Sequence, residues 1–427
     1  MKLPTAVLLA LCLLAAPWAA RAQDPPAPDP TDATALIDAL LGTLGGFAET
    51  TPADLQRDVA EVGGVPFRRD VPLDYMSKAD LTRYLRELFD SEYPPEKARA
   101  DERMLVAFGL LAEGDNLRAI RAKLLEDNVV GFYDERPDRR RLYAVSSNKR
   151  LTPANQIILA HELRHALQDQ YMDLHRSLPD TVGDFDDRRM ALMSLVEGDA
   201  TLVMEKFLTR RLGIDSGTLG NMDLGSMALP AGMGLPDTAP VLRDQLLVPY
   251  LSGRQFVYAL WQKGGWAGVR AAWDRPPFST EQVLHPEKYL AGEPASMPAL
   301  TFAPKGGTVV SDGVLGELFI RTLLGEGGEA GAAGWAGDHF KMWDLSGRSL
   351  LVWRSVWDSD AERAEFLAAA RRRLAAGDPA PTARGGFSVF TRGKWRVALG
   401  EVDGGVVYAS ADDASVLNTA LDDLGRR

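Results

Sequence analysis

Hydrophobic residues recur at helical spacing through much of the first 300 residues. In residues 78–89, for example, Leu81, Tyr84, Leu85 and Leu88 fall on one face of a helix. Comparable patterns predict helices at residues 35–47, 98–112, 116–126, 154–174, 187–211 and 241–263. The first two thirds of the chain are therefore expected to be mostly helical.

Two parts of the chain are instead rich in β-branched and aromatic residues. Near the middle, residues 129–133 and 141–145 form two such runs, and the turn-forming sequence 134–138 between them predicts a β-hairpin. Near the C-terminus, strands are predicted at 350–356, 387–390, 395–399 and 406–409, and helices at 360–373 and 412–424. This pattern predicts an α+β fold in which residues 300–427 form a separate, smaller α+β unit.

The predicted elements are connected by glycine-rich segments. Residues 213–240 have no steady period and predict a long loop, in which Met222, Met227 and Met233 form either an adaptable apolar surface or part of a flexible loop. Six glycines between residues 325 and 337 predict a second loop. The pair Gly264-Gly265 predicts the end of the helix that begins near residue 241.

The first 22 residues have the three parts of a secretory signal peptide. Lys2 gives a basic start, residues 6–16 are apolar, and Ala20-Arg21-Ala22 matches a cleavage site. The apolar run is too short to favour the alternative, a retained membrane anchor. We therefore expect cleavage after Ala22, export to the bacterial periplasm or the medium without a stable membrane span, and a flexible leader at residues 23–34.

Composition narrows the class of protein further. The chain has 427 residues, of which 46% are hydrophobic and 25% charged, so it is long enough for two compact domains with buried cores. Its formal net charge of −11 argues against a nucleic-acid binder or a polybasic membrane-surface protein. The one cysteine, Cys12, lies in the signal peptide, so the mature chain has neither disulfides nor a cysteine metal site. Nothing in the composition indicates an oligomeric state.

The clearest chemical pattern lies at residues 161–165, which read HELRH. Thr152-Pro153 provides an N-cap and a proline at the first helical position, which places this pattern inside a helix. His161 and His165 are four residues apart and share one helical face, so both imidazoles reach a single metal ion. Glu162 lies at the edge of that face, where it serves as a general base in HExxH zinc sites. The alternative interpretation is a solvated helix with two surface histidines.

A catalytic zinc ion needs a third protein ligand and an open coordination position. Glu197 is the best remaining donor, because it follows an apolar run in the next predicted helix, where a carboxylate needs a partner. Gly198 and Ala200 beside it would let two helices approach closely. Asp169 is expected to support His165 from the same helix. The weaker alternatives for the third ligand are Asp199, Glu205 and His175.

HELRH on one helix and Glu197 within EGDA on the next resemble the gluzincin branch of the zincin metallopeptidases, over about residues 128–212. The hairpin before HELRH resembles the edge-strand region where zincins pair with extended peptides. The 31 residues between His165 and Glu197 are more than thermolysin-like members have. Residues 279–289 are similar to a segment of uncharacterised exported bacterial HExxH proteins.

The resemblance implies a zincin-like catalytic domain over residues 35–299 and one Zn²⁺ per chain, bound by His161, His165 and Glu197. It also implies hydrolysis of peptide bonds in peptides or proteins, with Glu162 as the general base. The sequence therefore predicts an exported zinc-dependent endopeptidase. The alternatives are a catalytically silent zincin-fold binding or scaffold protein, and an interaction protein in which the tryptophan-rich C-terminal unit does the work.

A peptidase of this kind also needs a donor that stabilises the tetrahedral oxyanion beside the metal. His285 and Tyr289 are candidates, because such donors follow the glutamate ligand in gluzincins. Tyr250 and Tyr258 are further options.

Overall fold

The computed structural model of the chain describes residues 38, 41, 46–128, 131–145, 150–177, 185–214, 238–376 and 380–425. The predicted signal peptide (1–22) and leader (23–34) lie outside these residues. Most of the predicted loop at 213–240, including its three methionines, and most of the predicted helix at 35–47 also lie outside them.

Helices dominate the first three quarters of the chain, and strands dominate the last quarter. The helices of the described residues are α3 (Pro52–Val62), α4 (Lys78–Glu92), α5 (Pro95–Phe108), α6 (Leu117–Asn128), α7 (Pro153–Met172), α8 (Leu174–Ser177), α9 (Asp187–Leu212), α12 (Pro240–Asp274), α13 (Thr280–Leu284), α14 (Pro286–Ala291), α15 (Gly316–Leu324), α16 (Glu329–Ala332), α17 (Asp360–Ala375) and α18 (Ala414–Leu424). The strands are β1 (Leu73–Met76), β2 (Gly131–Asp134), β3 (Arg141–Val145), β4 (Thr308–Gly313), β5 (Trp335–Leu345), β6 (Arg348–Trp357), β7 (Thr382–Arg384), β8 (Phe387–Arg392), β9 (Trp395–Val402) and β10 (Gly405–Ala411).

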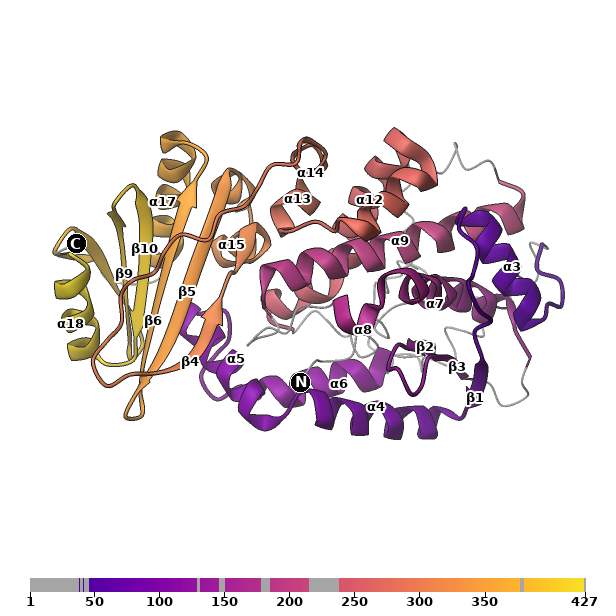
Figure 1. The fold of residues 1–427 in the computed structure, drawn as a ribbon. Helices are drawn as coiled ribbons and strands as arrows, with labels where there is room; N and C mark the ends of the chain where they lie inside the picture. Colours follow the sequence, from indigo (N-terminus) through magenta and orange to yellow (C-terminus); the bar gives the residue numbers. More distant parts are fainter. Residues whose placement is uncertain are drawn as a thin grey trace, which may run out of the picture.

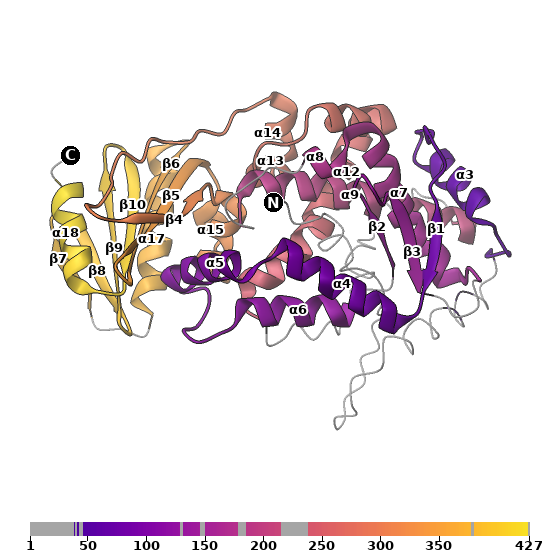
Figure 2. The same ribbon diagram turned by 60° about the horizontal axis from the view of Figure 1, so that its bottom comes forward.

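Two parts of the molecule lie side by side (Figures 1 and 2). One is built around helices α7, α9 and α12 with a three-stranded sheet in the order β1-β3-β2, and the other around a seven-stranded sheet in the order β4-β5-β6-β10-β9-β8-β7. This arrangement confirms the predicted α+β fold class. Within the described residues, every helix is too short or too polar to cross a lipid bilayer.

The small sheet contains the predicted hairpin. Strands β2 and β3 are antiparallel, with Phe132 opposite Tyr143 and Tyr133 opposite Leu142. Strand β1, which the sequence analysis did not predict, pairs in parallel with β3. Because it has only four residues, its pairing rather than its sequence pattern identifies it as a strand. Among the described strands, β2 therefore lies at an edge of the sheet.

Helix α7 is the central element of the helical part. The Thr152 side chain accepts a hydrogen bond from the backbone N–H of Asn155, and Pro153 takes the first helical position, as predicted. Asp173 ends the helix in the left-handed conformation, at φ 49°. Almost every residue between these ends is buried, because α3, α9, α12 and strands β2 and β3 contact the helix. The HELRH pattern therefore lies in the interior and not on a solvated face.

Helices α9 and α12 touch backbone to backbone at Gly198 and Gly253. A Cβ atom on Gly198 would lie 2.1 Å from the carbonyl oxygen of Gly253, and one on Gly253 would lie 2.2 Å from that of Ser194. The sequence analysis correctly expected a close approach at Gly198, although the partner is α12 and not the HELRH helix. The contact fixes α12 directly beside the part of α9 that carries Glu197.

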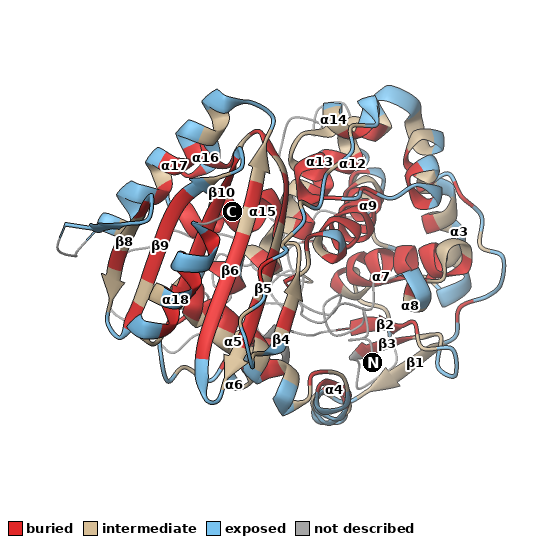
Figure 3. Cartoon of the chain, turned by 60° about the vertical axis from the view of Figure 1, so that its left-hand side comes forward, coloured by how far each residue is buried: buried red, intermediate tan, exposed pale blue. Residues whose placement is uncertain are grey.

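The seven-stranded sheet is covered on both faces, and its central strands β5, β6, β10 and β9 are buried along most of their length (Figure 3). Helix α18 packs on one face, against Val352 and Val407, while α15 and α17 pack on the other, against Trp353 and Tyr408. Helix α5, from the N-terminal half of the chain, joins this second face, where the Phe108 ring stacks on Tyr408 at 5.2 Å between centroids. The C-terminal sheet therefore shares its core with α5, which lies outside the predicted unit at 300–427.

Some predicted boundaries also differ from the structure. Helix α12 continues to Asp274 instead of ending at the glycine pair, because Gly265 (φ 57°, ψ −156°) kinks the helix without terminating it. The predicted loop at 325–337 contains α16 and the beginning of β5. Strands β4, β5 and β7 and helices α3 and α15 were not predicted.

Candidate metal centre

Helices α7 and α9 bring His161, His165 and Glu197 together. The two Nε2 atoms of the histidines are 2.9 Å apart, and Glu197 Oε2 lies 3.2 Å from His161 Nε2 and 3.5 Å from His165 Nε2. All three side chains are at most 1% exposed. The structure thus places the three residues that the sequence analysis selected as metal ligands at one buried point.

The size of this triangle fits a tetrahedral metal ion. With metal–ligand distances of about 2.05 Å, neighbouring ligand atoms in a tetrahedral zinc site are about 3.3 Å apart. The three observed separations lie on both sides of that value. Two imidazoles and one carboxylate are also a donor set found in catalytic zinc sites, which leave a fourth position open. The residues present therefore fit Zn²⁺.

The protonation states of the ligands also suit a cation. Burial lowers the pKa of His161, with a contribution from His165, and lowers the pKa of His165 to about 4. Both imidazoles are therefore neutral near pH 7 and have lone pairs for a metal. Burial raises the pKa of Glu197. Among the described residues, Glu197 Oε1 and His161 Nδ1 are buried without a hydrogen-bond partner, which is costly in a site that holds no cation.

A buried polar chain behind the metal site orients His165. His165 Nδ1 lies 2.9 Å from Gln168 Oε1, and Gln168 Nε2 donates to Val196 O and to Asp199 Oδ2. Gln168, and not Asp169, is therefore the residue that supports His165. Such a partner fixes the tautomer in which Nε2 faces the metal.

Asp199 anchors this chain of hydrogen bonds through a fully buried ion pair. Arg164 donates to it from Nε at 3.0 Å and from Nη2 at 2.9 Å, and Trp273 Nε1 donates at 3.1 Å. Its four hydrogen bonds, which include the one from Gln168, explain why Asp199, considered as an alternative ligand, does not point at the metal site. Glu205, the other alternative on α9, is paired with Arg254.

Glu162 lies beside the outer edge of β2. Its Oε2 atom accepts a hydrogen bond of 2.9 Å from the backbone N–H of Tyr133. Burial, followed by the nearby charge of Glu197, raises the pKa of Glu162 well above its usual range, and the hydrogen bond from Tyr133 opposes this rise. A carboxylate with a raised pKa is suited to accept and release a proton near neutral pH.

Tyr250 of α12 is the tyrosine that reaches the site. Its ring stacks on His161 with 6.0 Å between the ring centroids, and a hydrogen bond from its side chain lowers the pKa of Glu197. Tyr258, the other tyrosine considered on α12, instead stacks on Trp261. The backbone contact at Gly253, one helical turn after Tyr250, explains how α12 comes close enough to α9 for this interaction.

The two oxyanion donors that the sequence analysis favoured make other contacts. His285 Nε2 lies 3.1 Å from Glu317 Oε1, and this hydrogen bond raises the pKa of His285. The hydroxyl of Tyr289 donates to the carbonyl oxygen of Arg275 at 2.7 Å. The structure therefore brings Tyr250 to the metal ligands. His285 and Tyr289 instead bond Glu317 and the backbone of Arg275.

A second group of acidic side chains encloses a lysine and not an open site. Lys288 Nζ lies 2.8 Å from Glu281, 3.0 Å from Glu293 and 2.6 Å from Asp358. The ammonium group takes the position that a metal ion would need. This cluster joins α14 to the segment after β6 and so links the two parts of the molecule.

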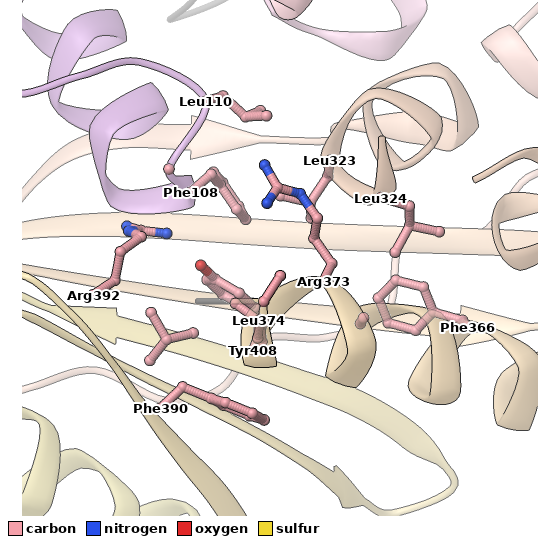
Figure 4. Close-up of a pocket in the computed structure, with 14 residues that line it drawn as sticks. Phe108, Leu110, Leu323, Leu324, Phe366, Arg373, Leu374, Phe390, Arg392 and Tyr408 are labelled. Carbon is pink, nitrogen blue, oxygen red and sulfur yellow. The ribbon is translucent and has the colours of Figure 1, made fainter. Parts of the chain in front are cut away.

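The C-terminal sheet contains a cavity of about 90 Å³ beneath α17 (Figure 4). Phe108, Phe390 and Tyr408 line it with rings, and Arg373 extends into it from α17. Arg392 at its edge donates to the carbonyl oxygens of Val106 and Ala107, and so caps the C-terminal end of α5. The lining is apolar apart from Arg373, Arg392 and the hydroxyl of Tyr408.

Comparisons with known proteins bear only on the C-terminal part. A family model described as a domain of unknown function (DUF8575) matches residues 307–423, from β4 into α18. No curated protein and no solved structure matches the chain. The matched range contains none of the candidate metal ligands.

Proposed function

We propose that the protein is an exported zinc-dependent endopeptidase with a zincin-like catalytic part, in which His161, His165 and Glu197 bind one Zn²⁺. The observation that carries the proposal is the buried triangle of these three ligand atoms, with Glu162 and Tyr250 close to Glu197. Two neutral imidazoles and a buried glutamate that converge on one point have a clear use as zinc ligands.

When bound, zinc supplies Lewis acidity that polarises a peptide carbonyl and lowers the pKa of water. Glu162 takes the proton from the attacking water and delivers it to the leaving nitrogen, for which its raised pKa is suited. Tyr250 donates its hydroxyl proton in a hydrogen bond to the developing oxyanion. Gln168 holds His165 in the tautomer that leaves Nε2 free to bind.

Strand β2 supports a peptide as the substrate. Among the described strands it pairs on one side only, with β3. Its four residues are buried, so its other edge can pair with an extended chain once the elements that cover it move. The N–H of Tyr133 marks this edge, because it donates to Glu162 and not to another strand. A peptide on this edge would pass next to the general base.

The test compares peptide hydrolysis by wild-type protein and by Glu162→Gln, each with and without a zinc chelator. We expect Glu162→Gln to keep its zinc and its fold but to lose hydrolysis by several orders of magnitude, because only proton transfer is removed. Glu287→Gln, an exposed change on α14, serves as the control and should hydrolyse as wild type does. Near-normal hydrolysis by Glu162→Gln would refute the mechanism.

The burial of the site favours one alternative function, a catalytically silent protein. Glu162 and the three ligands are all at most 1% exposed, so a substrate enters only if the surrounding elements move. A catalytically silent protein that uses its zinc for structure would show the same burial. In that case wild-type protein would contain one zinc ion per chain and hydrolyse no peptide, while removal of zinc would lower its melting temperature.

A further inference from the structure

Arg189 is a buried arginine in which one terminal nitrogen, Nη2, has no hydrogen-bond partner. Its side chain is on the first turn of α9 and is 3% exposed. Within the described residues its backbone N–H donates to Asp186, but Nη2 makes no hydrogen bond. Asp186 attracts the charge of the guanidinium, but a buried nitrogen that makes no hydrogen bond is still destabilising, because its desolvation is not compensated. Such a group needs an explanation outside the packing of the fold.

Arg189 lines a small cavity that also reaches the metal site. Glu197 and Tyr250 lie at one end of the cavity, and its walls between α9 and α12 are mainly apolar. The remaining lining residues are Met190, Met193, Gln245, Leu246 and Pro249. The free space is about 10 Å³, enough for about one water-sized group.

The side-chain acceptors in the walls of this cavity have other roles, and none of them bonds Arg189 Nη2. Gln245 Oε1 already accepts a hydrogen bond of 2.6 Å from Arg121. Glu197, the one acid in the lining, belongs to the metal triangle. The planar fork of an arginine matches a carboxylate in both shape and charge. An incoming carboxylate would therefore give Arg189 the partner that it lacks.

We propose that Arg189 binds a carboxylate of the peptide substrate, two to three residues from the bond that is cut. This proposal rests on the proposed peptidase function for the identity of the ligand as a substrate. Arg189 and Glu197 are eight residues apart on α9, about 12 Å along the helix axis. An extended peptide covers that distance in about three residues. The carboxylate is either the C-terminus of the peptide or an Asp or Glu side chain.

The first test is the stability of Arg189→Met, measured as the melting temperature of the full chain without added peptide. Methionine fits the apolar walls and removes the unbonded Nη2 nitrogen, while both Arg188 and Arg189 interact electrostatically with Asp186, so we expect Arg189→Met to melt no lower than Arg188→Met. Arg188→Met is the matched control, because Arg188 is exposed, and it should melt as wild type does. A lower melting temperature for Arg189→Met than for Arg188→Met would show that the guanidinium supports the fold, and would overturn the proposal.

The second test measures binding of four peptides to zinc-loaded Glu162→Gln protein by calorimetry. The peptides are acetyl-hexa-alanine with a free carboxylate, its C-terminal amide, and two further amides with one Glu or one Gln near the C-terminus. A free acid that binds at least tenfold more tightly than its amide identifies the C-terminus as the ligand, and the same preference for Glu over Gln identifies a side chain. Adding Arg189→Met should abolish the preference, and Arg189→Lys should retain part of it.

Equal binding of all four peptides, or no binding of any, would overturn the proposal. Failure of the proposed function gives a different result. If wild-type protein hydrolyses no peptide but the carboxylate preference depends on Arg189, the peptidase function is refuted and the carboxylate site remains.

Discussion

Asp199 and Glu197 lie two residues apart on α9, and their replacement by the corresponding amides should have opposite consequences. Asp199 accepts four hydrogen bonds in a fully buried position, two of them from Arg164. Glu197 faces two neutral histidines and the cavity that Arg189 lines. We predict that Asp199→Asn mainly destabilises the fold and weakens zinc binding to a smaller extent, whereas Glu197→Gln mainly weakens zinc binding and spares the fold.

The size of the effect at Asp199 follows from its partners. Its Oδ2 atom accepts from Arg164, Gln168 and Trp273, and its Oδ1 atom accepts from Arg164 alone. The Asp199→Asn substitution turns one oxygen into an NH₂ group that faces an arginine donor in either orientation. Removing one partner of a buried ion pair costs about 3–5 kcal/mol, because the other charge is left uncompensated. Zinc affinity should fall by only about 10–100-fold, as for other residues that support a metal ligand indirectly.

For Glu197→Gln the balance is reversed. A carboxylate ligand contributes charge to a dication, so zinc affinity should fall far more than in Asp199→Asn. Without zinc, Glu197 is a buried acid whose pKa is raised by burial, so the amide should leave the stability of the zinc-free protein unchanged or raise it. Removal of zinc should accordingly lower the melting temperature of wild type much more than that of Glu197→Gln.

The assay combines denaturant unfolding in the presence of a chelator with a competition titration for zinc. Wild type, Asp199→Asn and Glu197→Gln are compared in both measurements. If Asp199→Asn unfolds at the same denaturant concentration as wild type, the buried ion pair with Arg164 does not stabilise the fold. If Glu197→Gln binds zinc as tightly as wild type, Glu197 is not a ligand, and the proposed metal centre loses its third member.

Three further predictions concern single residues of the site. His161→Ala and His165→Ala should each lose most of one zinc ion per chain by elemental analysis, and His175→Ala should lose none. Tyr250→Phe should keep zinc and lower kcat by about 10²–10³, because one oxyanion donor is removed, whereas an unchanged kcat would exclude that role. Burial lowers the pKa of His165 to about 4 in the folded chain, while an unfolded histidine titrates near 6.5, so His165 should contribute a loss of about 3 kcal/mol of stability to the zinc-free protein as the pH falls from 6.5 to 4. His165→Gln should flatten this part of the stability profile, and a slope equal to that of wild type would contradict the assignment.

The three candidate metal ligands could be predicted from the sequence because each is marked by its immediate sequence neighbours. The four-residue spacing of His161 and His165 places both on one helical face, and Glu197 is conspicuous as an acid after an apolar run. The supporting residues were harder to find, since Gln168 and Arg164 are identified by partners on other elements. One signal was present: Arg164 lies inside a helix that is otherwise almost entirely apolar around the histidines, where a charged residue needs a partner.

The fold was predicted best where the hydrophobic periodicity of the sequence is strong. It was predicted worst where a segment becomes a strand only through pairing with a distant strand. Helices α7 and α9 and the β2–β3 hairpin lie where the pattern placed them. Strand β1 could not be predicted, because its four residues gain their structure from pairing with β3. The sequence offered Tyr250 only as a further option after His285 and Tyr289, because its position beside the metal ligands depends on the backbone contact of Gly198 with Gly253.

The packing of α5 on the C-terminal sheet has a consequence for the order in which the chain can fold. Phe108 stacks on Tyr408, so the ribosome must add about 300 residues before the two rings can meet, which takes about 15–60 s at 5–20 residues per second. During that interval the end of α5 around Phe108 lacks the sheet that covers it. A newly made chain is therefore most exposed to aggregation, and to capture by chaperones, at a helix that it completes within about its first quarter.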